Sequence, residues 1–226
     1  SDNAIVGSDG NLSVGGCSIA EIAAEYGTPV FVYDEAHLRA RCQQAVAAFG
    51  HQQVVYATKA FLCKAMARLV YEEGLLLDVA SGGELAVVLA AGVPADVCTL
   101  HGNNKSMKEL SEAIVAGVRH IIVDSFDELD RLDILAAEQL GPIPKVLLRI
   151  TPGVSAHTHE FIATGQDDSK FGFNLGNGDA LKAVDRARQS TSVELVGVHC
   201  HIGSNVFKAS SFARTAAVMA DFAVPL

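Results

Sequence analysis

Hydrophobic residues in this chain gather in short runs that alternate with longer stretches of mixed character. The runs occupy residues 54–58, 75–80, 97–100, 120–123, 145–150 and 193–200. Brief apolar runs are typical of strands in a parallel sheet, since both faces of such a strand are covered. The pattern therefore predicts six strands.

The stretches between these runs predict helices, because their apolar residues recur at intervals of three and four positions. The clearest cover residues 64–73, 84–91, 107–116 and 126–139. Each is followed by a glycine suited to a left-handed helix end, namely Gly74, Gly92, Gly117 and Gly141. At the start of the last of these helices, Ser125 is expected to be the N-cap and Glu128 its capping-box partner.

Strands that alternate with helices predict βαβ units and a parallel sheet. The first five strands start at intervals of roughly 21 to 25 residues, a regularity that favours a (β/α)8 TIM-type barrel over a doubly wound sheet. No G-x-G-x-x-G sequence follows any run, which weakens the dinucleotide-binding alternative. A closed barrel has eight strands, so we expect an incomplete one, with about six of the eight strands in this chain.

The first part of the chain breaks this alternation. It predicts a helix at 19–26, a strand at 29–33 and a second helix at 37–49. We expect residues 1–35 to form an N-terminal segment whose strand belongs to a β-rich domain. Residues 36–226 are expected to form the barrel.

A second irregular stretch, residues 152–178, follows the fifth predicted strand and is rich in Gly, Thr, His and Asp. Loops of this length are uncommon in compact domains and are often functional. This one leaves the sheet at the C-terminal end of a strand, where barrel enzymes place their chemistry. We therefore expect it to border a site.

Composition and charge narrow the functional classes. Half of the 226 residues are hydrophobic, and the formal net charge of −9 argues against nucleic-acid and anionic-membrane partners. No apolar run approaches the roughly 18 residues of a membrane-spanning helix, and the first residues do not resemble a signal peptide. Five scattered cysteines without a C-x-x-C pair predict reduced thiols in a cytoplasmic protein.

Lys59, at the end of the first predicted strand, is the polar residue that changes this picture most. Burial at a strand end would lower the pKa of a lysine, and a neutral amine can form a Schiff base with an aldehyde. The alternative is a lysine whose stem follows the strand while its amine reaches solvent.

The other strand ends also carry polar residues. They are Asp78, Ser81, Glu84, His101, Asn103, Asn104, Asp124, Arg149, Thr151, His199, His201, Gly203 and Ser204. In a barrel these residues converge on one mouth, either as a site or as a structural polar network. The Gly203-Ser204 turn predicts a phosphate site, with an ordinary strand-to-helix turn as the alternative. His199 and His201 face the same side of a strand, but no spacing fixes a third ligand. His157 and His159 are further candidate ligands, yet we expect no metal.

Several motifs resemble those of the diaminopimelate decarboxylases, which belong to the alanine racemase-like and ornithine decarboxylase-like class of pyridoxal-phosphate enzymes. They are YATKA at 56–60, LDVASGGE at 77–84, HGNNKS at 101–106, LRI at 148–150, SKFG at 169–172 and GVHCHIGS at 197–204. Residues 158–165 favour the diaminopimelate branch over the ornithine branch. The resemblance implies a pyridoxal-phosphate-binding (β/α)8 barrel of the alanine racemase type.

The resemblance implies catalytic roles for three residues. Lys59 carries the Schiff base to pyridoxal 5'-phosphate, His201 stacks on the pyridine ring, and Asp78 lies near both Lys59 and the cofactor. The implied reaction removes the carboxylate from the D-configured centre of meso-diaminopimelate and yields L-lysine and CO2.

Cofactor contacts are implied for four further residues. Arg149 approaches the phenolic oxygen, Ser204 with Gly203 binds the phosphate, and Glu84 lies near Lys59. Asn205 departs from the glutamine that is more usual after this Gly-Ser pair.

The resemblance also implies that the full-length protein is a cytoplasmic homodimer. The family's glycine-rich phosphate loop, the glutamate that pairs with the pyridine nitrogen and the C-terminal β-domain are expected beyond residue 226. Residues 1–226 alone are therefore expected to be inactive. The alternatives are a decarboxylase of the same class that acts on ornithine, arginine or carboxynorspermidine, a non-catalytic pyridoxal-phosphate carrier barrel, and an inactive truncated product.

Overall fold

The computed structural model of the protein describes residues 2–154, 171–204 and 206–226. Its centre is a parallel sheet of six strands whose order in space follows their order in the chain. The strands are β4 (Val55–Ala57), β5 (Leu76–Val79), β6 (Cys98–Leu100), β7 (His120–Val123), β8 (Lys145–Thr151) and β10 (Glu194–His199). A two-residue strand, β9 (Phe173–Asn174), pairs with β8 outside this path.

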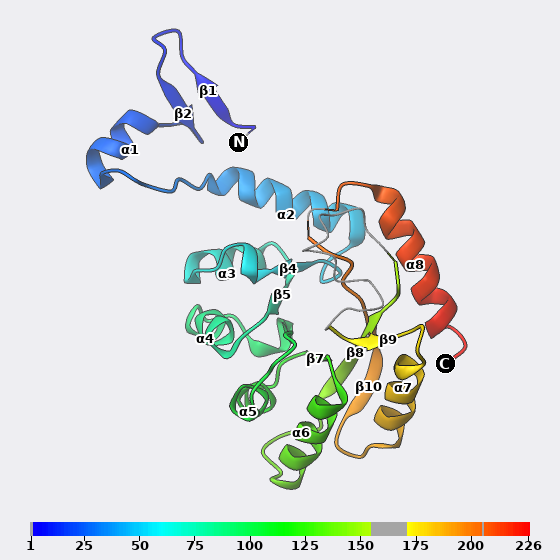
Figure 1. The fold of residues 1–226 in the computed structure, drawn as a ribbon. Helices are drawn as coiled ribbons and strands as arrows, with labels where there is room; N and C mark the ends of the chain where they lie inside the picture. The colour runs from blue at the N-terminus through cyan, green and yellow to red at the C-terminus, as the bar shows by residue number, and fades with distance from the viewer. Residues whose placement is uncertain (1, 155–170, 205) are drawn as a thin grey trace.

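This sequential order distinguishes a barrel from a doubly wound sheet, in which the strand order reverses partway across. The helices that connect the strands form an arc on one side of the sheet (Figure 1). They are α3 (Lys64–Glu72), α4 (Gly82–Ala90), α5 (Met107–Ala116), α6 (Phe126–Ala137) and α7 (Asp179–Gln189). The predicted fold class, a (β/α)8-type barrel with six strands present, is confirmed.

The core lies between the sheet and the arc of helices. Leu77, Leu100 and Ile121 of the middle strands have no exposed surface, and Val88 and Leu110 face them from the helices, equally covered. Burial of one such side chain contributes about 1.5–3 kcal/mol. The outer strands differ, since β4 and β10 each pair with a single neighbour on the main path of the sheet among the described residues.

Three of the four glycines predicted to end helices adopt the left-handed conformation expected there. Gly74, Gly92 and Gly117 have φ angles of 82°, 78° and 74°. The prediction for Gly141 is wrong: α6 ends at Ala137, and Gln139, with φ 51°, adopts the left-handed conformation instead.

The predicted capping box at the start of α6 forms only in part. Ser125 accepts a hydrogen bond from the Glu128 backbone, as expected. The Glu128 carboxylate accepts instead from the backbone N–H of Asp124, at 3.2 Å. A complete capping box forms at α5, between Ser106 and Glu109.

The N-terminal segment matches its prediction in the helix at 19–26 but not in its strand. Three short strands, β1 (Ala4–Val6), β2 (Leu12–Val14) and β3 (Cys17–Ser18), form an antiparallel sheet and lead into α1 (Ile19–Tyr26). Figure 1 shows the β1–β2 hairpin standing apart from the barrel. Residues 29–33 form no strand, because β propensity is realised only beside a pairing partner. Whether this segment joins a β-rich domain stays a prediction.

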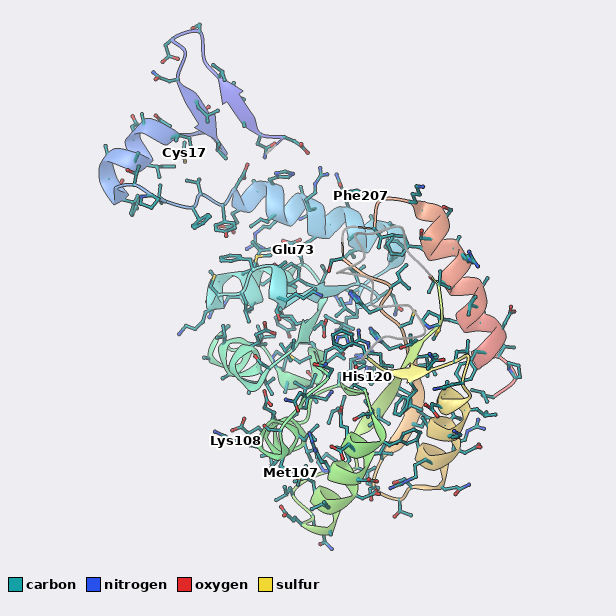
Figure 2. All side chains as sticks on the ribbon, in the orientation of Figure 1. Cys17, Glu73, Met107, Lys108, His120 and Phe207 are labelled. Carbon is teal, nitrogen blue, oxygen red and sulfur yellow. The ribbon has the colours of Figure 1, made fainter. Side chains whose placement is uncertain are left out.

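Two helices flank the sheet at its ends. α2 (Glu35–Phe49) precedes β4, and α8 (Ala209–Ala223) follows β10. Glu73, labelled in Figure 2, is the residue that directly follows α3. It binds Arg39 of α2, with 2.7 Å between Arg39 Nη1 and Glu73 Oε1. No helix in the described parts of the chain is long and apolar enough to cross a bilayer.

Candidate functional site

Lys59 lies directly after β4, in a short 3-10 turn, η1 (Thr58–Ala60). The side chain is exposed, so the expectation of a buried strand-end lysine is wrong. Within residues 1–226, β4 lies at the edge of the sheet, and Val55 on it is also 46% exposed. The argument for Lys59 therefore rests on its neighbours and not on desolvation.

Thr58 holds the turn that carries Lys59. Its buried hydroxyl lies 2.7 Å from the carbonyl oxygen of Asp78 and 2.9 Å from the carboxylate of Glu84. The same Glu84 oxygen accepts from the backbone N–H of Ala80, at 2.6 Å. Glu84 thus connects η1 to the loop after β5, and it lies near Lys59 through its contact with Thr58.

Asp78, His101 and His199 form a cluster at the ends of β5, β6 and β10. Asp78 Oδ2 lies 3.4 Å from His101 Nδ1. The rings of His101 and His199 meet edge to face, with centroids 4.7 Å apart. Burial lowers the pKa of His199 to about 3, and the neighbouring His101 and Arg149 add to the effect. His199 is therefore neutral at neutral pH.

His201 follows β10 and is half-buried. Burial lowers its pKa to about 4, and the positive charges of Lys59 and Arg149 add to the effect. Lys59, which follows the first strand, therefore lies within electrostatic range of His201, which follows the last. His201 is neutral at neutral pH.

Arg149 lies on β8 with only 6% of its surface exposed. Its Nη1 donates to Asp124 Oδ1 at 2.9 Å, and its guanidinium carbon lies 4.6 Å from the ring centre of Phe171. The second oxygen of Asp124 accepts from the backbone N–H of Gly172, at 3.1 Å. Arg149 is therefore fixed in place by the end of β7 and by the residues that follow position 170.

The Gly203-Ser204 turn is open to solvent at Ser204. Gly203 has φ 125°, a value that side-chain-bearing residues rarely adopt. The helix α8 begins at Ala209. Phe207, labelled in Figure 2, precedes it and is 92% exposed. Phosphate binding by this turn stays a prediction.

Two further residues belong beside the site. Lys105 and Glu128 form a buried ion pair, with 2.8 Å between Nζ and Oε1. The sequence indicates only a motif position for Lys105 and a capping role for Glu128, because an ion pair between two strand–helix units leaves no local pattern. His157, His159, the 158–165 stretch and Asn205 lie outside the described residues.

A partly open cavity of about 450 Å³ lies against the inner side of the sheet, and its lining runs from Gln52 and Arg119 at the N-terminal ends of the strands without including Lys59, Arg149 or His201. Asp78, His101 and His199 line it near the C-terminal ends of their strands. Volumes of this order are ordinary for small-molecule sites. Within the described parts of the chain, no three His, Cys, Asp or Glu side chains are arranged to hold a metal ion.

These side chains fit a pyridoxal group. Asp78 Oδ1, His101 Nε2 and His199 Nδ1 are buried, yet no described residue hydrogen-bonds to them, and buried polar atoms normally have partners. With the amine of Lys59 and the guanidinium of Arg149, they offer a reactive amine, hydrogen-bonding groups and a cation to a planar, polar, anionic ligand.

Comparisons with known proteins agree with this fit. The family described as "Pyridoxal-dependent decarboxylase, pyridoxal binding domain" matches residues 35–224. Diaminopimelate decarboxylase from Mycobacterium tuberculosis strain H37Rv is 51% identical over 204 residues, 90% of this chain and 45% of the relative. The Bacillus subtilis enzyme is 49% identical over 211 residues, 92% of this chain and 48% of the relative. The chain thus spans about half the length of these curated relatives.

Solved structures show the same likeness. Diaminopimelate decarboxylase from M. jannaschii, in co-complex with L-lysine, superposes with a TM-score of 0.86 and 34% identity over 98% of this chain and 52% of its own. The Helicobacter pylori diaminopimelate decarboxylase complexed with L-lysine superposes with a TM-score of 0.76 and 26% identity, over 88% of this chain and 51% of its own. The lysine/ornithine decarboxylase of Vibrio vulnificus, at 20% identity, shares the fold with a TM-score of 0.70. This chain belongs to the pyridoxal-dependent decarboxylases, and its residues 35–224 match their pyridoxal-binding domain.

Proposed function

We propose that the full-length protein decarboxylates meso-diaminopimelate at its D-configured centre and releases L-lysine and CO2. The observation that carries the proposal is the 51% identity to a diaminopimelate decarboxylase across 90% of this chain. Two of the similar solved structures, themselves diaminopimelate decarboxylases, hold L-lysine. The relatives are about twice as long as this chain, so the activity is proposed for the protein in which these residues occur together with the remainder.

Pyridoxal phosphate, when bound, supplies an aldehyde for the substrate amine and a ring that accepts the electron pair released with CO2. Lys59 is the side chain that would hold it covalently, since its amine is exposed at the strand ends. Lys105 is unsuited to that role. Its ammonium is committed to the carbonyl oxygens of Gly102 and Ile122 and to Glu128.

The remaining side chains bind and orient. His201, neutral at pH 7, offers an uncharged flat face for the ring. Arg149 places a fixed positive charge near His201, suited to an anionic oxygen of the cofactor. Asp78 and His101 present polar atoms from the adjacent strand ends. The N–H groups and hydroxyl of Gly203 and Ser204 suit the phosphate.

The assignment of Lys59 is tested by borohydride reduction of the holoenzyme and peptide mapping. We expect the pyridoxyl group on Lys59 and none on Lys64, which is also exposed. A pyridoxyl group on Lys64 or Lys105 would contradict the assignment.

The substrate is tested by decarboxylation assays of the full-length enzyme. We expect lysine release from meso-diaminopimelate and at least about a hundredfold lower kcat/KM for ornithine or arginine, because a site built for a polar distal group rejects ligands that leave it unpaired. Comparable turnover of ornithine would place the protein in another branch of the class.

We also propose that the full-length protein is a homodimer of the cytoplasm. All five cysteines are free, in keeping with a reducing compartment. Sedimentation of the full-length protein would reveal the dimer, and a monomer at micromolar concentration would contradict it.

A further inference from the structure

Four charged side chains lie buried together beneath the site. They are Lys105 and Glu128, each 3% exposed, Asp124 at 4% and Arg149 at 6%. They come from three successive strand–helix units: the loop after β6, the end of β7 with the start of α6, and β8. Two are positive and two are negative, so the group carries no net charge.

Lys105 connects two loops of the barrel. Its Nζ donates to the carbonyl oxygens of Gly102, at 2.6 Å, and Ile122, at 2.7 Å. The same Nζ lies 2.8 Å from Glu128 Oε1. The ammonium thus makes two hydrogen bonds to carbonyl oxygens and one ion pair with a carboxylate.

Glu128 connects Lys105 to Asp124. Its other carboxylate oxygen accepts from the Asp124 backbone N–H at 3.2 Å. Asp124 in turn binds Arg149 through one oxygen, at 2.9 Å, and the Gly172 N–H through the other, at 3.1 Å. A continuous path of contacts therefore runs from Lys105 to the guanidinium of Arg149.

Buried ion pairs are weak contributors to net stability, because desolvation offsets much of the attraction. Removal of one partner is more serious, since it leaves a buried charge uncompensated. Without Lys105, the carboxylates of Glu128 and Asp124 would share one cation, Arg149. Either Glu128 would take up a proton or it would compete with Asp124 for the guanidinium.

We propose that Lys105 and Glu128 are positioning residues that hold Asp124, and through it the guanidinium of Arg149, in the geometry that meets the cofactor. The proposal rests on the proposed function, in which Arg149 faces pyridoxal phosphate. Neither residue touches the cofactor in this arrangement. Their effect reaches it through Asp124 and Arg149.

The test uses full-length enzyme and two readouts, the dissociation constant for pyridoxal phosphate and the absorption spectrum of the bound cofactor. Lys105→Met retains the length of the side chain and removes the charge. We expect it to weaken cofactor binding about tenfold, a usual size for coupling within such a network, and to shift the spectrum. Leu132→Ala, in the core of the same helix α6 but without a charged contact, is the control for lost stability.

A double variant distinguishes an effect through the charged contacts from a general loss of packing. In Lys105→Met/Glu128→Gln no unpaired carboxylate remains, and the amide oxygen can still accept from the Asp124 N–H. We expect the double variant to recover several-fold in cofactor affinity over Lys105→Met. Where Lys105→Met fails to fold, Glu128→Gln alone is compared with Leu132→Ala in the same way.

The proposal is overturned if Lys105→Met changes cofactor affinity and spectrum no more than Leu132→Ala does. It is equally overturned if the double variant binds as weakly as Lys105→Met. Failure of the proposed function is separate, because there the wild-type enzyme itself would not release lysine from meso-diaminopimelate or would not carry pyridoxal on Lys59.

Discussion

At the scale of single residues, charge state separates the members of the site. His199 and His201 have pKa values lowered to about 3 and about 4, chiefly by burial. Both are neutral at pH 7, whereas Arg149 is a cation that pairs with Asp124. A planar, electron-poor ring bearing an anionic oxygen is suited to this combination of flat neutral faces and one fixed cation.

The two histidines predict an acid-sensitive fold. In the unfolded chain their pKa values return to about 6.5. Between that value and their folded pKa values the unfolded state binds more protons, so the free energy of unfolding falls as pH falls. We expect a combined loss on the order of 3–5 kcal/mol between about pH 7 and about pH 4.5, with the smaller share from the half-buried His201, measured by urea denaturation. His199→Phe should reduce the loss, and the exposed His51→Phe should leave it unchanged. An equal loss in both variants would contradict this origin.

Gly172 is required by close packing as well as by its backbone angle. Its φ is +72°, and an added Cβ would lie 2.6 Å from the carbonyl oxygen of Arg149. Gly178 has a similar φ of +83° but open space around it. Gly178→Ala should therefore cost about 1 kcal/mol of unfolding free energy from backbone strain, and Gly172→Ala about 2–4 kcal/mol, because the clash adds to the strain. Thermal or urea unfolding measures the free energy lost in each variant. Equal losses would contradict the prediction, since they would mean that the clash with the Arg149 carbonyl adds no destabilisation.

At the scale of elements, the site depends on how loops are connected to one another. The turn η1 belongs to an edge strand and would be poorly fixed by pairing alone. Its attachment comes from Thr58, whose hydroxyl meets both the Asp78 carbonyl and the Glu84 carboxylate. The loop after β5 thus positions the lysine that follows β4.

This attachment predicts a distinct effect for Thr58 variants. Thr58→Val keeps the shape but removes the hydroxyl, so the Glu84 carboxylate loses a hydrogen bond in a half-buried place. We expect about a tenfold or larger decrease in the rate at which Lys59 captures pyridoxal phosphate, corresponding to about 1–3 kcal/mol for a group left unsatisfied. Stopped-flow absorbance measures the rate. Thr58→Ser, which retains the hydroxyl, should stay within about threefold of wild type, and a slow Thr58→Ser would point to the lost methyl group instead.

At the scale of the whole molecule, the six strands form a sheet with two open sides. β4 and β10 each leave one side unpaired on the main sheet path among the described residues, and Val55 and Val196 on them are 46% and 40% exposed. Unpaired edges with apolar side chains invite association. The exposed apolar surface of the N-terminal segment, including Phe31 at 90%, adds to this tendency.

A polypeptide of residues 1–226 alone is therefore expected to associate and to show no decarboxylase activity. Light scattering should detect species larger than the 23.7 kDa monomer. Val55→Lys/Val196→Lys should reduce association, because edge lysines oppose strand pairing. Val115→Lys, on the exposed side of α5, is the control and should have little effect. A monodisperse monomer that releases lysine from meso-diaminopimelate at an ordinary enzymatic rate would contradict both expectations.

The amino-acid sequence by itself determined the alternation of strands and helices, because apolar periodicity and glycine caps are local properties. The bounds of α1, α5 and β7 follow from them directly, and so does the list of polar residues at the strand ends. The motifs were also enough to indicate the family that the comparisons show.

Only the tertiary structure decided which of these residues are buried and which groups meet. Within the described residues, Lys59 is exposed where β4 lies at an edge, and residues 29–33 form no strand. Glu128, locally a capping residue, instead meets Lys105 from a neighbouring strand–helix unit. Pairing partners and ion pairs across units depend on residues far apart in the chain, and the pattern within any one segment carries no record of them.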